Sequence, residues 1–301
     1  MNPRRLALSI ALASSFLAAC SDDTTTVTVP DNSTRSVSIA FEAVSGSTPI
    51  ACGTTLTALG TTSTSAPVRD FRYYIHDVKL VKADGSSTPV TLDANTHQLG
   101  NVALIDHTGG KCDATPAPTT TLGSTVTGKI PNDSAVYTGL EFTVGVPQSM
   151  NHRDRTAAAS PLNIAALHWA WQSGYKHATL EVQPTGGITR PTDPAFSNTV
   201  FNIHLGSTGC TNSTVTGTGS CTNNNRPLIN LSGYTLNTSK VRLDYAALVA
   251  NSKLTEDGGG PAGCMSGVTD PECGVIFDAL GLNLTTGVPA PALTQTVFSL
   301  Q

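Results

Sequence analysis

Histidine is the residue type in this sequence that is best suited to chemistry at a metal. The chain has seven histidines, although only 13% of its residues are charged. Neutral imidazole is a good ligand for copper, zinc, iron and nickel. No established spacing such as HExxH is present, so the candidates are ranked by their predicted positions. Three stand at a strand end or turn beside a loop that carries a tryptophan or a cysteine: His76, His152 and His204. Three others are expected to be structural or exposed: His97, His168 and His177.

The tryptophans are the second indication of chemistry. Aromatic residues make up 5% of the chain, and the two tryptophans, Trp169 and Trp171, are one residue apart. A serine followed by proline, as at Ser160-Pro161, is typical of a helix start, and Gly174 is typical of a helix end. We therefore predict a short helix that runs from Ser160 through Trp169 and ends before Gly174. The usual role of tryptophan is to pack in a core, so a chemical role needs further support.

Apolar and polar residues alternate along several short segments, as expected for strands that bury one face. These segments are Ser36–Val44, Asp70–Lys82, Val102–Asp106, Ala135–Val146, Tyr175–Val182, Phe201–Leu205, Asn230–Leu231 and Val241–Asp244. A helical turn is predicted at Tyr245–Asn251, and a short helix or strand at Val275–Leu284. Strict alternation places His76 on the same face as Val78 and Leu80. Because glycine, proline and small polar residues separate the segments, we predict a mostly β, β-sandwich-like single domain with long loops and a few short helices.

Cysteine usage indicates an exported protein with disulfides. The sequence Leu17-Ala18-Ala19-Cys20 is typical of a lipoprotein cleavage site, with Cys20 as the residue that carries the lipid. The other six cysteines are an even number, and six cysteines allow fifteen pairings. Proximity favours Cys210–Cys221 and Cys264–Cys273, which leaves Cys52 and Cys112 for each other. None of them forms a CxxC pair, so structural disulfides are favoured over a zinc or redox site.

The first residues have the composition of an export signal. Arg4 and Arg5 precede an apolar run that is too short for a resident membrane helix. We predict a signal peptide over residues 1–19, a flexible tether over 20–35 and a β domain over 36–301. Ser21, and not an aspartate, stands directly after the lipidated cysteine, which favours a lipid anchor in the outer membrane and a domain in the periplasm.

Charge and motifs argue against several functions. The net charge is −4 and no basic stripe exists, which argues against a nucleic-acid partner. The sequence Gly206-Ser207-Thr208-Gly209 lacks the strand–GxSxG–helix context of a nucleophile elbow. No glycine-rich phosphate loop opens a helix, and the acidic residues are too scattered to single out a catalytic pair.

Segments spread over most of the mature chain form a specific combination. They are ACG at Ala51–Gly53, DFRYYIHDVKL at Asp70–Leu80, GVPQSMNH at Gly145–His152, SPLNIAALHWAWQSGYK at Ser160–Lys176, FNIHLGSTGC at Phe201–Cys210, NRP at Asn225–Pro227, LDYAAL at Leu243–Leu248 and GCMSGVTDPEC at Gly263–Cys273. In this order they resemble the MbnP family, also called metallo-mystery pair four-Cys motif proteins. The family name implies four cysteines, whereas this chain has six outside the lipidation site, so at least one pair is additional or variable.

The resemblance implies a periplasmic copper-binding protein in copper homeostasis. It also implies a partner, a MauG-like dihaem protein of the cytochrome c peroxidase family, which oxidises a tryptophan of this chain to kynurenine. Opening the five-membered ring of an indole gives an aryl amine beside a ketone, which can approach a metal. The expected copper ligands are two or three of His76, His152 and His204 with the modified tryptophan, for which Trp171 is preferred to Trp169. The chain is then a substrate of its partner rather than an enzyme.

Two other classes of function stay open. One is a surface β-sandwich that binds a glycan or a protein, with the tryptophans as a stacking platform, and it predicts no metal in the purified protein. The other is an enzyme with its own metal, and it predicts turnover without any haem partner.

Overall fold

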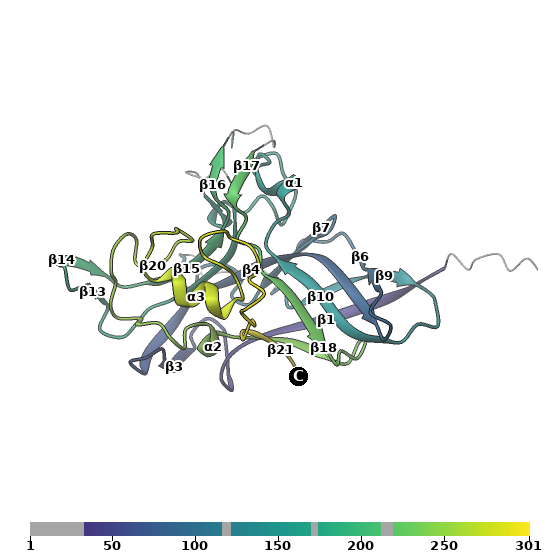
Figure 1. Cartoon of the computed structure of the whole chain (residues 1–301), viewed down its shortest axis with the longest axis horizontal. Helices are drawn as coiled ribbons and strands as arrows, with labels where there is room; N and C mark the ends of the chain where they lie inside the picture. Colours follow the sequence, from purple (N-terminus) through teal and green to yellow (C-terminus); the bar gives the residue numbers. More distant parts are fainter. Residues whose placement is uncertain (1–32, 116–121, 170–173, 212–218) are drawn as a thin grey trace, which may run out of the picture. The chain divides into compact units, whose positions relative to one another are not determined.

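Two packed β-sheets form the framework of the protein (Figure 1). The computed structural model describes residues 33–115, 122–169, 174–211 and 219–301, and residues 33–301 form one compact unit. Strands dominate and the helices are short, so the prediction of a mostly β, sandwich-like fold is confirmed. Within the described ranges, no helix is long and apolar enough to cross a membrane.

The first sheet is built around one long strand near the amino end of the described chain. Its six strands are β1 (Thr34–Ser45), β2 (Thr48–Pro49), β6 (Thr91–Leu92), β9 (Thr125–Pro131), β19 (Lys240–Asp244) and β21 (Phe298–Leu300). Their order is β21-β19-β1-β9-β6, with β2 beside β1. The pairing of β1 with β19 is parallel and that of β1 with β9 is antiparallel.

The second sheet carries most of the candidate residues. Its eleven strands are β3 (Thr55–Leu59), β4 (Thr64–Lys82), β5 (Ser87–Pro89), β7 (Gln98–Leu99), β8 (Val102–Asp106), β10 (Tyr137–Val144), β11 (His168–Trp169), β12 (Gly174–Val182), β15 (Phe201–Gly206), β18 (Leu228–Ser232) and β20 (Gly263–Cys264). Its main path is β18-β10-β4-β12-β15-β20, and the long strand β4 also pairs with β3, β5 and β8. Strands β4, β12 and β15 thus lie side by side, and they position the site.

Two hairpins and a few helical turns complete the described chain. The hairpins are β13 (Ile188–Arg190) with β14 (Asp193–Asn198), and β16 (Thr208–Thr211) with β17 (Ser220–Asn223). The helices are α1 (Gln148–Asn151), α2 (Tyr245–Leu248), α3 (Cys273–Ala279) and the 3₁₀ turn η1 (Ala165–Leu167). The helical turn predicted after Asp244 is present as α2, and the side chain of Asp244 caps it by accepting from the N–H of Ala246.

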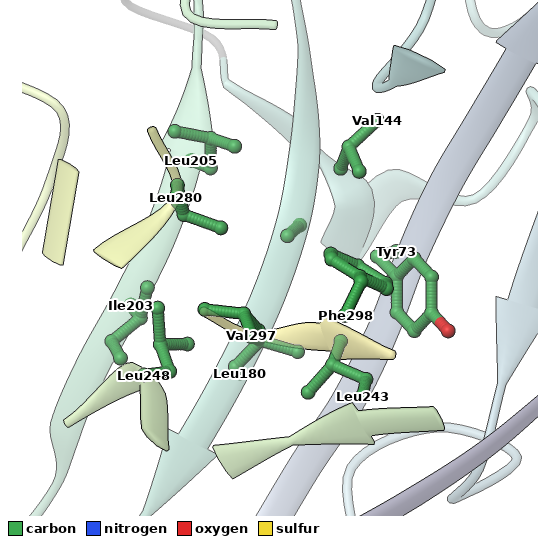
Figure 2. A pocket seen from close by; sticks show the side chains of 11 residues that line it. Tyr73, Val144, Leu180, Ile203, Leu205, Leu243, Leu248, Leu280, Val297 and Phe298 are labelled. Carbon is green, nitrogen blue, oxygen red and sulfur yellow. The ribbon is translucent and has the colours of Figure 1, made fainter. Parts of the chain in front are cut away.

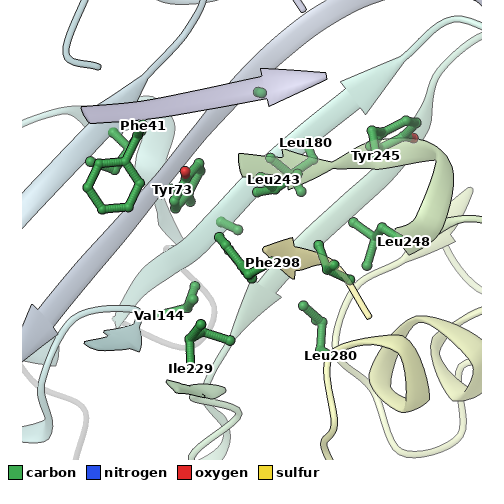
Figure 3. Close-up of a cluster of buried hydrophobic side chains, with 14 of the residues drawn as sticks. Phe41, Tyr73, Val144, Leu180, Ile229, Leu243, Tyr245, Leu248, Leu280 and Phe298 are labelled. Atoms are coloured by element: carbon green, nitrogen blue, oxygen red, sulfur yellow. The ribbon is translucent and has the colours of Figure 1, made fainter. Parts of the chain in front are cut away.

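The core lies between the two sheets, where apolar side chains from β4, β12 and β15 meet those from β19 and β21 (Figure 2). Phe41 of β1 packs edge-on against Phe142 of β10, with ring centroids 5.7 Å apart. Phe298 of β21 makes a similar contact with Phe142. It makes another with Tyr73 of β4 (Figure 3). Each such buried side chain contributes roughly 1.5–3 kcal/mol to folding.

An apolar cavity of about 20 Å³ remains inside this core (Figure 2). Its lining includes Tyr73, Leu180 and Phe298, and it has no polar surface. A space of this size lined by hydrocarbon stays dry. It is therefore a packing gap and not a ligand site.

A β-bulge in β4 changes which residues face the core. His76 pairs with Thr143 and Lys79 with Glu141, so β4 has one residue more than β10 between these pairs. Asp77 lies in this bulge and has the left-handed conformation, with φ of 52°. Aspartate tolerates this conformation better than most residues do. The prediction that His76 shares a face with Val78 and Leu80 is wrong, because both belong to the core between the sheets while His76 lies on the other side.

That other side is called the outer face here, meaning the face of the second sheet that is turned away from the first. Residues 146–169, the cover segment, pack on it. A second apolar cluster joins the two: Tyr74, Val102, Leu104 and Tyr175 of the sheet with Val146, Met150, Leu162 and Leu167 of the cover segment. The hydroxyl of Tyr74 donates to the carbonyl of Pro161 at 2.8 Å, and that of Tyr175 to the carbonyl of Leu162 at 2.6 Å.

The helix predicted from Ser160 through Trp169 is wrong. The segment forms turns, the single turn η1 and the short strand β11, which pairs with β12. The hydroxyl of Ser160 donates to the carbonyl of Thr96 instead of capping a helix. The carbonyls of Pro161 and Leu162 accept from the two tyrosines, so tertiary hydrogen bonds replace the helical ones.

The three disulfides are confirmed with the pairing predicted from proximity. Cys52 is bonded to Cys112, Cys210 to Cys221, and Cys264 to Cys273. The Cys210–Cys221 bond joins β16 to β17, whereas Cys264–Cys273 ties β20 to α3. The predicted signal peptide and Cys20 lie outside the described residues, as does most of the tether.

Candidate metal site on the outer face

His76 has the hydrogen bonding expected of a metal ligand. It is 5% exposed, and its Nδ1–H donates to the carbonyl of Gly145 at 2.8 Å. Burial lowers the pKa of His76, although this hydrogen bond and the charge of Asp77 oppose the effect, so the ring is neutral near pH 7. Nε2 then holds the lone pair, 3.7 Å from Oδ2 of Asp77. Ligating histidines are commonly oriented in this way by a carbonyl on the second nitrogen.

His177 is a structural histidine. The N–H of Val146 donates to its Nδ1 at 3.3 Å, and its Nε2–H reaches the carbonyl of Asn224 and the hydroxyl of Ser207. Burial holds its pKa well below the usual value, and the charges of Arg226, His76 and His152 lower it further. Both ring nitrogens of this fully buried side chain are engaged, which agrees with the structural role expected for it. His76 is close to this ring through Gly145, whose carbonyl accepts from His76 and whose added Cβ would stand 2.7 Å from Cγ of His177. His152 is close through the chain between Cys221 and Asn224, which contacts both histidines.

His152 follows α1 and is almost completely buried, at 1% exposure. The side-chain amide of Asn151 donates to its Nε2 at 3.4 Å, and Sγ of Cys221 is 3.3 Å from the same nitrogen. His168 is half-buried with its ring edge-on to Tyr175, 5.2 Å between centroids. Burial lowers the pKa of His168, and the charges of Arg155 and His152 add to this.

His204 lies on the outer face of β15, beside Glu181 of β12. Its Nε2 is 2.8 Å from Oε1 of Glu181. Burial alone would raise the pKa of Glu181, but hydrogen bonds and charges of His204 and Lys111 outweigh it and lower the pKa to about 2. Glu181 is therefore an ionised acceptor for Nε2–H. Burial lowers the pKa of His204 despite that carboxylate, so its ring is neutral near pH 7 and Nδ1 carries the lone pair.

Trp169 joins this second histidine. Trp169 belongs to β11, where it pairs with Gly174 of β12, and it is 6% exposed. The ring lies against Gly206 of β15, where an added Cβ would stand 2.4 Å from Cζ3 of the indole. The ring centroids of Trp169 and His204 are 6.5 Å apart. Only a glycine at position 206 admits the indole at this depth.

The register of the strands separates His204 from His76. Arg72 of β4, Thr179 of β12 and His204 of β15 lie in one line across the sheet. His204 is thus two strands away from β4, roughly 10 Å, and His76 is four residues from Arg72, roughly 13 Å along the strand. Their backbones are roughly 16 Å apart, and side chains stand nearly perpendicular to a sheet. His76 and His204 are too far apart to bind one ion together.

The candidates therefore form two neighbourhoods. His76 and His152 belong to the one around His177, and His204 and Trp169 to the other. Trp171 lies outside the described residues. Sequence reasoning missed Glu181 and Gly206, because an acidic residue in an alternating strand and a glycine at a strand end have no spacing that marks them.

Among the described residues, one group of three has metal-ligand atoms close together. It consists of Nε2 of His152 and the sulfurs of Cys210 and Cys221, all within 4.8 Å of one another. The two sulfurs form a disulfide, and disulfide sulfur is not the thiolate that binds copper or zinc. In this oxidised state the group is not a metal site.

Comparison with known proteins adds the family. The model of the family described as MbnP matches residues 34–266, more than half of the chain. The chain belongs to the MbnP family. The fold is similar to that of MbnP from Methylosinus trichosporium, with a TM-score of 0.79 and 31% sequence identity over 89% of this chain and 98% of that one. No curated protein matches the sequence. The match of the MbnP model extends over the three strands β4, β12 and β15 that carry the outer face.

Proposed function

We propose that this MbnP-family protein is a periplasmic lipoprotein that binds copper through histidine nitrogen and a kynurenine made from one of its tryptophans, in copper homeostasis. The observation that carries the proposal is the contact between Trp169 and His204. It brings an oxidisable indole beside a neutral imidazole that a carboxylate orients. A carboxylate on the second ring nitrogen raises the basicity of a ligating histidine.

The donor set suits copper. His204 offers the unprotonated Nδ1, Glu181 fixes the tautomer, and the aryl amine of kynurenine adds a second nitrogen. Copper bound by such nitrogen donors can be stored or passed on. Soft and borderline metals accept neutral nitrogen ligands, whereas magnesium and calcium prefer oxygen. His76 and His152 form the second neighbourhood, and they are the ligands to test if His204 is not one.

The proposed partner is a MauG-like dihaem protein, and this chain is its substrate and has no activity of its own. Trp169 is 6% exposed, so haem in another protein cannot touch it and the oxidising equivalents must cross the protein between them. Trp171, preferred from the sequence, is the alternative site of modification. The lipid on Cys20 would keep the domain at the outer membrane on its periplasmic side.

The burial of Trp169 bears on the main alternative. An aromatic platform for a glycan needs an exposed ring face, and this indole is covered by β15. Trp169 therefore does not serve as such a platform, and a glycan-binding function would need other residues.

The modification is tested by producing the chain alone and together with the dihaem partner. Tandem mass spectrometry of the peptide Ser160–Lys176 should find two intact tryptophans in the first sample. In the second, one tryptophan should have exchanged a ring carbon for oxygen, and copper should bind to that sample only. Two intact tryptophans after reaction with the partner and peroxide would refute the proposal. A kynurenine at Trp171 would keep the copper function and move the site away from Trp169.

A further inference from the structure

We propose that the Cys210–Cys221 disulfide masks a second metal site, which binds monovalent copper through both cysteine thiolates and His152 once the disulfide is reduced. This inference is independent of kynurenine and of His204. It rests on three residues that come from two different parts of the chain and meet at one point, with Nε2 of His152 3.3 Å from Sγ of Cys221.

The hairpin holds the two sulfurs together without their bond. Cys210 and Cys221 face each other directly across β16 and β17, and the pairs Thr208–Asn223 and Thr211–Ser220 flank them. Strand pairing therefore keeps the two side chains opposite each other after reduction. Two thiolates at this spacing, with an imidazole alongside, are the soft ligands that select Cu(I). A structural zinc site would need a fourth ligand.

The histidine is fixed against the hairpin by contacts that do not involve the disulfide. The amide of Gln148 donates to the carbonyl of Gly219 at 2.6 Å, which ties α1 to the residue directly before β17 (Figure 1). An added Cβ at Gly219 would stand 2.8 Å from the imidazole of His152, so glycine is needed there for the ring to fit. The amide of Asn151 donates to Nε2, and the same amide group accepts from the N–H of Tyr175. Nε2 is thus held as the unprotonated nitrogen.

The Cys210–Cys221 disulfide is accessible to a reductant. Cys210 and Cys221 are partly exposed, whereas Cys264 and Cys273 are buried. A dithiol reductant would attack one sulfur, form a mixed disulfide and leave as its own disulfide, so that its two electrons and two protons produce two thiols. Binding of Cu(I) then displaces those two protons and leaves copper on two thiolates and one neutral imidazole.

The test uses the full mature chain made without its partner, so that no kynurenine is present. A water-soluble phosphine reduces the disulfide, because phosphorus takes an oxygen from water and the two protons go to the sulfurs. Mass spectrometry of the peptides verifies which disulfides have opened. Cu(I) uptake is then measured against a chromogenic Cu(I) chelator before and after reduction. We expect one additional Cu(I) per chain after reduction, with ultraviolet absorption from thiolate-to-copper charge transfer.

Variants decide the ligands. The double variant Cys210→Ser/Cys221→Ser should lose the additional Cu(I), and Cys52→Ser/Cys112→Ser should keep it. His152→Ala should lower the affinity of the reduced protein for Cu(I) at least about tenfold, because it removes one of the three ligands. No additional Cu(I) after verified opening of Cys210–Cys221 would overturn the proposal. So would resistance of this disulfide to the phosphine, equal uptake in the Cys210→Ser/Cys221→Ser variant, unchanged affinity in His152→Ala, or uptake of zinc in preference to copper.

Discussion

Replacing Gly206 by alanine should displace Trp169 from its place on the sheet. The added Cβ would stand 2.4 Å from Cζ3 of the indole, and ordinary contact begins at 3.4 Å. The indole must therefore move by about 1 Å, or β15 must yield by the same amount. Overpacking of this kind typically destabilises a protein by about 1–3 kcal/mol. Because the ring also contacts His204, the same displacement should lower the yield of kynurenine if Trp169 is the residue that is oxidised.

The assay is urea unfolding followed by fluorescence in a Trp171→Phe background, in which all tryptophan emission comes from Trp169. The variant should lose about 1–3 kcal/mol of unfolding free energy, and its emission should shift to the red because the displaced ring meets water. Gly274→Ala is the matched control. Nothing lies within 4 Å of a Cβ at that position, and alanine in helix α3 should stabilise the protein slightly. Wild-type stability and emission in Gly206→Ala would show that the indole does not rest on β15.

Three further predictions concern the core and the charges. Burial without a hydrogen-bond partner at Nε2 lowers the pKa of His107 from 6.5 to about 4. As the pH falls, the unfolded chain therefore binds a proton at this histidine before the folded protein does. About 3 kcal/mol of the unfolding free energy, present above pH 6.5, should be lost by pH 4. Urea unfolding across this pH range should show that His107→Leu loses about 3 kcal/mol less than the wild type, and parallel pH profiles of the two proteins would disprove the assignment. Phe298→Ala should destabilise the protein by about 3–5 kcal/mol, because the ring fills the core between Tyr73 and Phe142. Leu293→Ala, at an exposed position, is the control. Similar losses of unfolding free energy in both variants would contradict the packing of Phe298. Glu181→Gln should weaken copper binding by about 10–100-fold, because His204 loses the carboxylate that orients it. Equilibrium competition with a chelator measures the affinity, and Glu256→Gln is the control. An unchanged affinity in Glu181→Gln would show that Glu181 does not belong to the site.

Alternation was a good guide to the strands because each of them buries one face. It placed β1, β4, β12 and β15 correctly to within a few residues, apart from the first six residues of β4. It failed at Asp77, where one extra residue reverses the facing of everything that follows. Alternation cannot reveal a bulge, since the extra residue is fixed by the pairing with β10 and not by the residues around it.

The helix prediction failed for a similar reason. Ser160-Pro161 is a fair local signal, but the hydroxyls that replace the helical hydrogen bonds come from Tyr74 and Tyr175. Tyr74 is far away in the sequence, so a local pattern cannot include it. The disulfides were predictable because two pairs are close in sequence and only one pair remained.

The grouping of the histidines was the least predictable part. All three of His76, His152 and His204 are buried. His152 lies in the turn after α1, as predicted, whereas the prediction of a strand end is wrong for His76, which lies inside β4, and His204 lies inside β15. Their division into two neighbourhoods follows from the order β4-β12-β15 and from its register, which only the fold determines. The partner of His204, Glu181, became visible for the same reason.

The central claim is that His204 holds copper beside a modified tryptophan, and the copper affinity of one variant pair tests it most directly. Wild type, His204→Ala and His97→Ala are each produced with the dihaem partner, checked for kynurenine by mass spectrometry and titrated with copper against a competing chelator. His97 is half-buried with its ring against Gly123, so its replacement should leave the affinity as in the wild type. His204→Ala should lower it at least about tenfold with kynurenine still present. Equal copper affinity in all three proteins would contradict the account.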